Sequence, residues 1–198
     1  MASSYTPQDS AILLIDHQDM TGGWINSQPR QTCVNNVRML ARIGEELGVP
    51  LLVTSTMEDQ IGTNITDIQE LAPAAYARRI KRGGTLNTFL DPGFADAVRG
   101  LGRQKLILAG LTTDICLFHS AVGALDAGYD IQVVGDACGS SSQMADDLTF
   151  SRLRSLGAII TDGNQILSEL YTDFGSPEGQ KAQQINLEEI IQRQTVTA

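Results

Sequence analysis

Lys105-Leu-Ile-Leu-Ala-Gly-Leu-Thr-Thr-Asp-Ile-Cys116 is the stretch that decides the fold, because an apolar run ends at a glycine and passes directly into a polar turn. The run Lys105–Gly110 has the continuous apolar character of a strand buried on both faces of a parallel sheet. Helical spacing follows over Thr113–Ala127 and stops before Gly128, a common helix end signal. The stretch therefore predicts a strand that opens into a helix at the carboxyl edge of a sheet.

The same alternation extends from this unit toward both ends of the chain. Further strands are predicted at Ala11–Ile15, Leu51–Ser55, Tyr76–Ile80, Asp130–Val134 and Ala158–Thr161. Further helices are predicted at Arg30–Leu47, Asn64–Leu71, Asp91–Leu101, Met144–Leu156 and Asn164–Tyr171. Strands that alternate with helices across short connections favour a parallel sheet with helices on both faces. We therefore expect one α/β domain over residues 1–175, a three-layer α/β/α sandwich, followed by a tail over 176–198 that packs on a neighbouring chain or frays.

The composition is that of an ordinary soluble domain with an acidic balance. Of the 198 residues, 42% are hydrophobic and 19% are charged, and 14 basic against 23 acidic residues give a formal net charge of -9. At this length about 70% of the surface of the unfolded chain can be buried, so a core requires neither a disulfide nor a structural metal. The chain lacks the basic character of proteins that bind nucleic acid or anionic membranes, so a small molecule is the expected partner.

Targeting signals and cysteine usage point to the cytoplasm. No apolar run approaches the roughly 20 residues that cross a bilayer. Residues 1–10 lack the basic start and apolar stretch of a secretory signal, so we expect a cytoplasmic protein without a membrane partner. Cys33, Cys116 and Cys138 are an odd number at wide spacing, which favours reduced thiols over a disulfide framework or a zinc site.

Polar residues follow four of the predicted strands at the edge where open parallel sheets bind their ligands. Asp16 follows the first strand, residues 81–84 follow the third, Thr112–Cys116 follows the fourth and Asp136–Ser142 follows the fifth. We therefore expect an acid, a cation and a thiol to converge at one edge of the sheet.

Cys116 falls in the first turn of its predicted helix, where unpaired N–H groups and the helix dipole favour a thiolate. The same N–H groups are suited to an oxyanion formed when that thiolate attacks a carbonyl. Asp16 is suited to take the thiol proton, and Arg82 or Lys81 to stabilise the remaining charge. A lone cysteine near a helix start is more often core packing. The combination with an acid and a cation is what favours catalysis.

These residues resemble the isochorismatase-like cysteine hydrolases over most of the chain, from about Ser10 to Leu170. Members of that family place an aspartate in an apolar-run-Asp-x-Gln setting, which Leu13-Leu-Ile-Asp-His-Gln18 matches. Their nucleophile lies in Gly-x-x-Thr-x-x-Cys, which Gly110-Leu-Thr-Thr-Asp-Ile-Cys116 matches. The second match is specific, since the glycine, the threonine and the cysteine must all fall in register.

The resemblance implies a six-stranded parallel sheet, an Asp-Lys-Cys triad, a cis peptide between Leu111 and Thr112, and an oxyanion hole made by the Thr112 and Cys116 amides. At the cation this chain departs from most relatives, because Arg82, 34 positions (116 minus 82) before Cys116, replaces the lysine as in the YcaC-type subgroup. Guanidinium is effectively always charged, so Arg82 can hold a thiolate or a substrate anion but hardly donates a proton. Lys81 is its strand neighbour and points to the opposite face, so only one of the two enters the site.

The expected activity is hydrolysis of an amide or related C–N bond in a small molecule, with Cys116 as nucleophile through a thioester, Asp16 as base and Arg82 as electrostatic partner. One alternative is hydrolysis of a vinyl ether, as in isochorismatase itself, without a covalent intermediate. Another is a catalytically silent oligomeric binding protein. Since the family commonly oligomerises, a homo-oligomer is expected.

Substrate contacts are expected from loops at the same edge of the sheet, from Met20, Trp24, Met57, Asn87 and Phe118. We expect no cofactor and no metal, because the chain lacks the histidines with which the related nicotinamidases bind metal after the second strand. His119 could form a dyad with Cys116 three residues earlier, but an ordinary helix histidine is favoured. His17 follows Asp16 on the strand and should point away from it, so a structural role is favoured.

Overall fold

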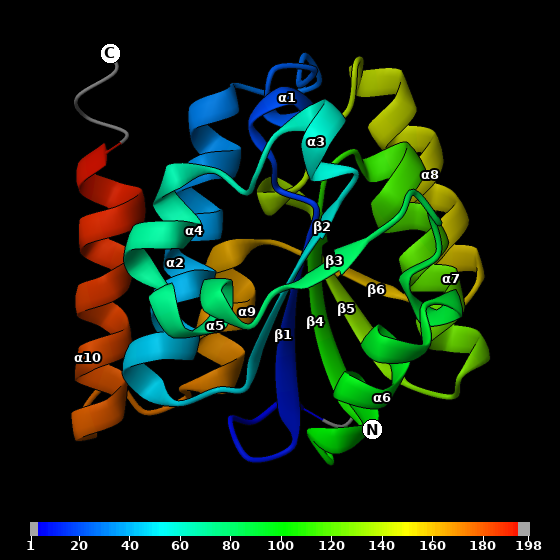
Figure 1. The fold of residues 1–198 in the computed structure, drawn as a ribbon. Helices are drawn as coiled ribbons and strands as arrows, with labels where there is room; N and C mark the ends of the chain where they lie inside the picture. Colours follow the sequence, from blue (N-terminus) through cyan, green and yellow to red (C-terminus); the bar gives the residue numbers. More distant parts are fainter. Residues whose placement is uncertain (1–3, 194–198) are drawn as a thin grey trace.

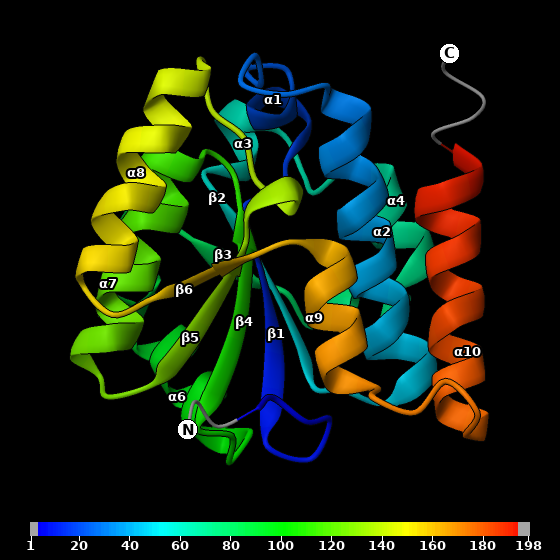
Figure 2. The ribbon, with the colours of Figure 1, turned by 180° about the vertical axis from the view of Figure 1, so that it is seen from behind.

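A sheet of six parallel strands separates two layers of helices (Figures 1 and 2). The computed structural model describes residues 4–193. The strands are β1 (Ser10–Ile15), β2 (Leu51–Thr56), β3 (Ile80–Arg82), β4 (Lys105–Gly110), β5 (Asp130–Val134) and β6 (Ile159–Thr161). Their order is β3-β2-β1-β4-β5-β6 and all five pairings are parallel, which confirms the predicted three-layer sandwich. The order changes direction between β1 and β4, and ligands of open α/β sheets bind at such a switch point.

Helices cover both faces of the sheet. One layer contains α2 (Arg30–Leu47) and α9 (Gly163–Leu170), with α4 (Thr66–Leu71) and α10 (Pro177–Asn186) packed against α2. The other layer contains α6 (Pro92–Gly100), α7 (Phe118–Asp126) and α8 (Gln143–Ser155) (Figure 1). The remaining short elements are α1 (Asp19–Gly22), α3 (Glu58–Ile61), α5 (Pro73–Ala77), η1 (Thr88–Leu90), η2 (Thr113–Leu117), η3 (Gly135–Ala137) and η4 (Leu187–Ile191). Figure 1 shows α1 and α3 above the carboxyl ends of β1 and β2, so short helical segments surround the edge that holds the candidate site.

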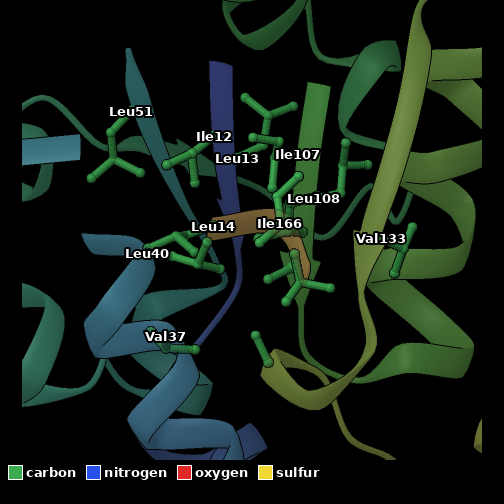
Figure 3. Close-up of a cluster of buried hydrophobic side chains, with 14 of the residues drawn as sticks. Ile12, Leu13, Leu14, Val37, Leu40, Leu51, Ile107, Leu108, Val133 and Ile166 are labelled. Carbon is green, nitrogen blue, oxygen red and sulfur yellow. The ribbon is translucent and has the colours of Figure 1, made fainter. Parts of the chain in front are cut away.

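The core lies between the sheet and the two layers. Every residue of β1 is buried, as expected for a central parallel strand. Val37, Leu40 and Ile43 of α2 recur at helical spacing and are fully buried. Figure 3 shows side chains of the central strands together with Val37 and Leu40 of α2 and Ile166 of α9. Each fully buried leucine or isoleucine contributes about 1.5–3 kcal/mol relative to an exposed one, so this core holds the strand ends of the site in place.

The strand predicted at Tyr76–Ile80 is wrong in its position. Residues 73–77 form α5, because Pro73 is favourable at the start of a helix and the alanines around it are strong helix formers. The strand begins only at Ile80, where Ile80–Arg82 pairs with Thr54–Thr56 of β2. Arg82 therefore lies inside the edge strand and next to the end of β2.

The helix predicted over Thr113–Ala127 is divided in two. Thr113–Leu117 forms the π-helical turn η2, and the regular helix α7 begins at Phe118. The carbonyl of Thr112 accepts hydrogen bonds from the amides of Ile115 and Leu117, both at 3.2 Å. Cys116 thus lies in a widened turn ahead of α7, a feature common at functional sites.

The tail packs against its own domain. Both α10 and η4 contact α2. The buried Glu189 carboxylate of η4 accepts hydrogen bonds from Arg38 Nε at 2.6 Å, Arg42 Nη1 at 3.0 Å and Arg193 Nε at 2.9 Å. The segment 176–193 therefore does not fray, residues 194–198 lie outside the described residues, and contact of the tail with another chain stays a prediction. Over residues 4–193, none of the helices has the length and apolarity needed to span a bilayer.

Candidate active site

Asp16 occupies the carboxyl end of β1 in a left-handed backbone conformation, with φ of 54°. This region is sparsely populated for residues other than glycine, and it is tolerated best by Asp and Asn. The side chain is fully buried, and its Oδ1 accepts a hydrogen bond of 2.6 Å from Thr54 Oγ1 on the neighbouring strand β2. The end of β1 is therefore shaped to turn a carboxylate inward.

Arg82 meets that carboxylate from β3, on the far side of β2. Its Nη2 donates to Asp16 Oδ2, its Nη1 donates to the carbonyl of Thr85, and both charged side chains have no exposed surface. Removing two charges from water costs several kcal/mol per ion, which their attraction offsets only in good geometry. A fully buried ion pair at a ligand-binding edge is thus poorly explained by stability alone and indicates a functional site.

The Cys116 thiol is the third member of this group. Burial and, next to it, the neighbouring Asp16 carboxylate raise the pKa of Cys116 to about 12, although Arg82 acts in the opposite direction. In the free protein the residue is therefore a thiol, contrary to the thiolate that its place near a helix start suggested. The reason is that desolvation and the nearby carboxylate outweigh the dipole of a helix that begins only at Phe118.

The turn between β4 and Cys116 is tightly packed. The peptide bond between Leu111 and Thr112 is cis, and the Thr113 amide donates to the carbonyl of Gly139 at 3.0 Å. A Cβ at Gly110 would lie 3.0 Å from Cβ of Ile15 and 3.2 Å from Cβ of Leu117, closer than side chains normally approach. Glycine at position 110 therefore allows the end of β4 to approach both β1 and the turn that carries Cys116.

Gln18 is a site residue whose role the sequence did not reveal. Its Oε1 accepts from the Thr56 amide at 2.8 Å, and its Nε2 donates to the Thr56 carbonyl at 2.9 Å. The carboxamide thus pairs with the backbone of β2 in the manner of an additional strand residue. This contact fixes the loop after Asp16 to the strand that lies beside Arg82, which gives a physical reason for glutamine two positions after the aspartate.

Comparison with known proteins agrees with this geometry. Residues 10–165 match the isochorismatase domain. The chain belongs to the isochorismatase family. It is 29% identical over 167 residues to the probable hydrolase YcaC of Escherichia coli, an alignment that covers 84% of this chain and 79% of that protein.

Two solved structures extend the comparison to the fold. YcaC from Pseudomonas aeruginosa, solved with hexane-2,5-diol and covalent acrylamide, has a TM-score of 0.90 at 27% identity and covers 100% of this chain and 96% of its own. YcaC from E. coli, described as an octameric hydrolase of unknown specificity, has the same TM-score and coverage at 24% identity, which shows the shared fold. This isochorismatase-family chain is accordingly a hydrolase, and the resemblance to the YcaC-type subgroup is confirmed.

Three of the predicted substrate contacts are accessible. Met20, Trp24 and Met57 are 46%, 45% and 37% exposed and follow the ends of β1 and β2. A groove of about 600 Å³ adjoins the buried ion pair. It is lined by Met57, Glu58, Asp59, Gln60, Lys81, Arg82 and Gly83.

The other two predicted contacts already have partners within the protein. Asn87 Oδ1 accepts from the Phe89 amide at 2.9 Å, and its amide group lies against Gly123 of α7. Phe118 is largely buried, with the Arg152 guanidinium 4.6 Å from its ring centroid. A substrate role for this pair stays a prediction.

The remaining histidines and cysteines are placed differently. The fully buried His17 ring is hydrogen-bonded through Nε2 to the carbonyl of Ala137 at 2.9 Å, and burial lowers its pKa to about 4, so the ring is neutral and structural. His119 is exposed and stacks edge-on with Phe118. Cys33 and Cys138 are fully buried, and burial raises the pKa of both thiols. Within residues 4–193, no group of three or more His, Cys, Asp or Glu side chains could hold a metal ion.

Proposed function

We propose that this hydrolase cleaves an amide or related C–N bond in a small molecule, with Cys116 as nucleophile, Asp16 as general base and Arg82 as electrostatic partner. The observation that carries the proposal is the fully buried Asp16–Arg82 ion pair, which interacts with the Cys116 thiol at the switch point of the sheet. A buried acid and cation beside a nucleophile are what covalent catalysis requires.

The resting thiol defines the first step. As Sγ of Cys116 forms a bond to the substrate carbonyl carbon, its proton moves to the Asp16 carboxylate and the carbonyl electron pair moves to oxygen. The amides of Thr112 and Cys116 are the proposed donors to that oxyanion. Collapse of the intermediate breaks the C–N bond, and the proton held by Asp16 leaves with the amine.

The second half reaction uses the same residues. Asp16 takes a proton from water as the hydroxide attacks the thioester. The C–S bond then breaks to release a carboxylic acid, and the proton passes from Asp16 to sulfur, which restores the Cys116 thiol. Arg82 keeps its charge throughout, because guanidinium does not donate a proton at neutral pH. Its role is to hold Asp16 in place and to offset the negative charge that develops on sulfur.

The related P. aeruginosa protein suggests the probe for this mechanism. Its structure contains covalent acrylamide, an electrophile of the kind that thiols attack. Acrylamide and iodoacetamide should label Cys116 well ahead of the fully buried Cys33 and Cys138, with the labelled sites located by peptide mass.

The decisive comparison uses matched variants. Asp16→Asn should slow the labelling of Cys116, because loss of the proton acceptor outweighs the fall in the thiol pKa that loss of the carboxylate charge brings. Cys116→Ser should abolish turnover in a panel of small amides. Equal labelling of the three cysteines in the native protein would overturn the covalent proposal.

A second candidate is hydrolysis of a vinyl ether without a covalent intermediate, as in isochorismatase. The strongly raised pKa of Cys116 favours it, because a thiol at neutral pH is a weak nucleophile unless Asp16 removes its proton. Under this alternative Cys116→Ala would retain turnover of a vinyl ether. A silent binding protein would turn over neither substrate class, and Cys116→Ser would not change its ligand binding.

We further propose that the protein is a cytoplasmic homo-oligomer whose substrate contacts include Met20, Trp24 and Met57. The octameric state described for E. coli YcaC supports assembly. Exposed Met144 and Leu148, 71% and 67% accessible, offer an apolar face on α8. Light scattering tests the assembly, and a monomer at micromolar concentration would contradict it.

A further inference from the structure

The carboxyl end of β2 is unusually polar for a buried strand. Thr54, Ser55 and Thr56 are all buried, at positions where a strand covered on both faces normally carries aliphatic residues. Each has a polar contact: Ser55 Oγ donates to Glu58 Oε1 at 2.7 Å, the Thr56 backbone pairs with Gln18, and Thr54 Oγ1 donates to Asp16 Oδ1 at 2.6 Å. The Thr54 contact alone reaches a member of the proposed triad.

Thr54 is held rigidly, so its hydroxyl has a fixed position. It pairs with Ile15 in the register of β1 and β2. Its carbonyl accepts from the amide of Asp16 at 3.3 Å and from Asn64 Nδ2 at 2.9 Å. One residue therefore contacts both the backbone and the side chain of Asp16, at the point where that backbone is left-handed.

Two hydrogen bonds fix the orientation of the Asp16 carboxylate and leave its other acceptor positions open. An ionised carboxylate has about four acceptor positions, two on each oxygen. Thr54 occupies a position on Oδ1 and Arg82 occupies one on Oδ2, so rotation about the bond that carries the carboxylate would break both contacts. With both in place, the carboxylate presents one orientation to the Cys116 thiol.

We propose that Thr54 is a positioning residue for the reaction, because its hydroxyl holds the Asp16 carboxylate in the orientation that receives the Cys116 proton. The inference rests on the proposed function and deepens it. Thr54 touches neither the substrate nor the thiol in this scheme.

Two consequences separate this role from simple packing. Without the hydroxyl the carboxylate loses a charge-assisted hydrogen bond and its fixed orientation, so proton removal from Cys116 should slow by roughly 10- to 100-fold. Thr54→Ser, which keeps the hydroxyl but loses the methyl group, should restore the rate. A packing role predicts instead that loss of the methyl group slows labelling as well.

The experiment measures the rate of Cys116 labelling by iodoacetamide against pH, which requires no knowledge of the natural substrate. Thr54→Val replaces the hydroxyl with a methyl group of similar size that suits a strand, and Thr54→Ser retains the hydroxyl. Thr54→Ala and Thr54→Ser form a second pair that differs only in the hydroxyl, in case the valine variant does not fold. The matched control is Thr88→Val, which removes another fully buried hydroxyl, one without a hydrogen-bond partner among residues 4–193.

The expected result is slow labelling in Thr54→Val and Thr54→Ala, labelling within threefold of the native rate in Thr54→Ser, and the native rate in Thr88→Val. If Thr54→Ser is as slow as Thr54→Ala, or if the hydroxyl-free variants keep the native rate, the proposal is overturned. The variant Asp16→Asn distinguishes failure of the Thr54 proposal from failure of the proposed function. If Asp16→Asn does not slow labelling, the proposed triad is wrong. If Asp16→Asn labels slowly but Thr54→Val labels at the native rate, only the role of Thr54 is wrong.

Discussion

Ion pairs around a buried carboxylate occur in two regions of residues 4–193, and the surroundings of the two carboxylates differ. At the junction of α2 and η4, the Glu189 carboxylate is surrounded by Arg38, Arg42 and Arg193. At the carboxyl edge of the sheet, Asp16 pairs with one cation among the described residues, Arg82, and lies beside a thiol. At Glu189, three arginines surround one carboxylate and connect η4 to α2. The arrangement at Asp16 leaves acceptor positions open next to a nucleophile, which is what distinguishes a candidate catalytic acid from a structural one.

The largest expected effect comes from breaking the pair at the sheet edge. Arg82→Met leaves Asp16 buried without a charged partner, which should lower the free energy of unfolding by about 3–5 kcal/mol and remove turnover. Urea unfolding and an amide assay measure the two effects.

Arg82→Lys is the matched test of charge against shape, because it installs the cation that most family members carry. We expect it to retain activity within about tenfold, with a smaller loss of stability, since lysine keeps the charge but not the two-point contact with Asp16 and Thr85. If Arg82→Met were as stable as the native protein, the buried Asp16 carboxylate would not need a charged partner, and the predicted energetic difference between the two regions would be wrong.

The second prediction tests the structural pair. Glu189→Gln keeps the shape of the side chain but removes the charge that three arginines share, so stability should fall by about 1–3 kcal/mol while activity stays within twofold of native. The arginine hydrogen bonds lower the pKa of Glu189 although burial alone would raise it. A carboxyl group with a lowered pKa stabilises the fold above its ordinary pKa, and this contribution is lost as the pH falls through the folded value.

The difference in stability between native protein and Glu189→Gln should therefore shrink as the solution is acidified toward and below the ordinary pKa of glutamate. Urea midpoints at a series of pH values measure it. A difference that does not change with pH would assign the effect to packing instead of charge.

The partly buried Asp136 carboxyl group has a pKa shifted in the opposite direction from that of Glu189. Burial raises the pKa of Asp136, behind the end of β5, to about 6, although the Gly163 amide donates to its Oδ1 at 2.9 Å. Because the folded pKa lies above the unfolded value of 3.8, the ionised form is disfavoured by folding. Above pH 6 this carboxylate costs stability, and the cost disappears as the pH falls from about 6 to about 4.

Asp136→Asn should therefore raise the free energy of unfolding at pH 7 by up to about 3 kcal/mol, since the pKa shift is about two units and each unit corresponds to about 1.4 kcal/mol. The gain should vanish near pH 4. Thermal melting of both proteins at the two pH values checks the prediction. A variant that is less stable than native at pH 7 would show that the carboxylate is needed to cap α9.

The contrast between these acids also explains what could be predicted from the sequence. Asp16, Cys116 and a cation at Lys81 or Arg82 were identified because each follows a predicted parallel strand, and the topology of such sheets brings those ends together. The choice of Arg82 over Lys81 came from the family resemblance. Thr54 was missed because threonine is an ordinary strand residue, and only the register of β1 against β2 places its hydroxyl on Asp16. The raised pKa of Cys116 was missed because burial depends on the whole tertiary structure.

The position of the edge strand was predicted wrongly from the local sequence, because pairing with β2 determines where β3 begins. The stretch Tyr76–Ile80 was predicted as a strand, yet its first half continues the helix started at Pro73. The edge strand was instead formed by residues that pair with β2, and their charges gave no strand signal. The two charged residues that follow Ile80 in the strand lie on opposite faces: Arg82 turns inward and Lys81 turns outward.

The smallest effect is expected for Lys81, and it completes the comparison. Lys81 is adjacent to Arg82 in sequence, but its side chain is 61% exposed and its ammonium pairs with Glu58 at 2.8 Å, beside Arg79. Exposed pairs of this kind contribute about 0–1 kcal/mol. Lys81→Ala should therefore change the free energy of unfolding by less than about 0.5 kcal/mol and leave Cys116 labelling within twofold of native. A large loss of turnover with unchanged labelling would instead show that the groove beside Arg82 uses the ammonium to bind substrate, because Lys81 lines that groove while lying outside the buried ion pair.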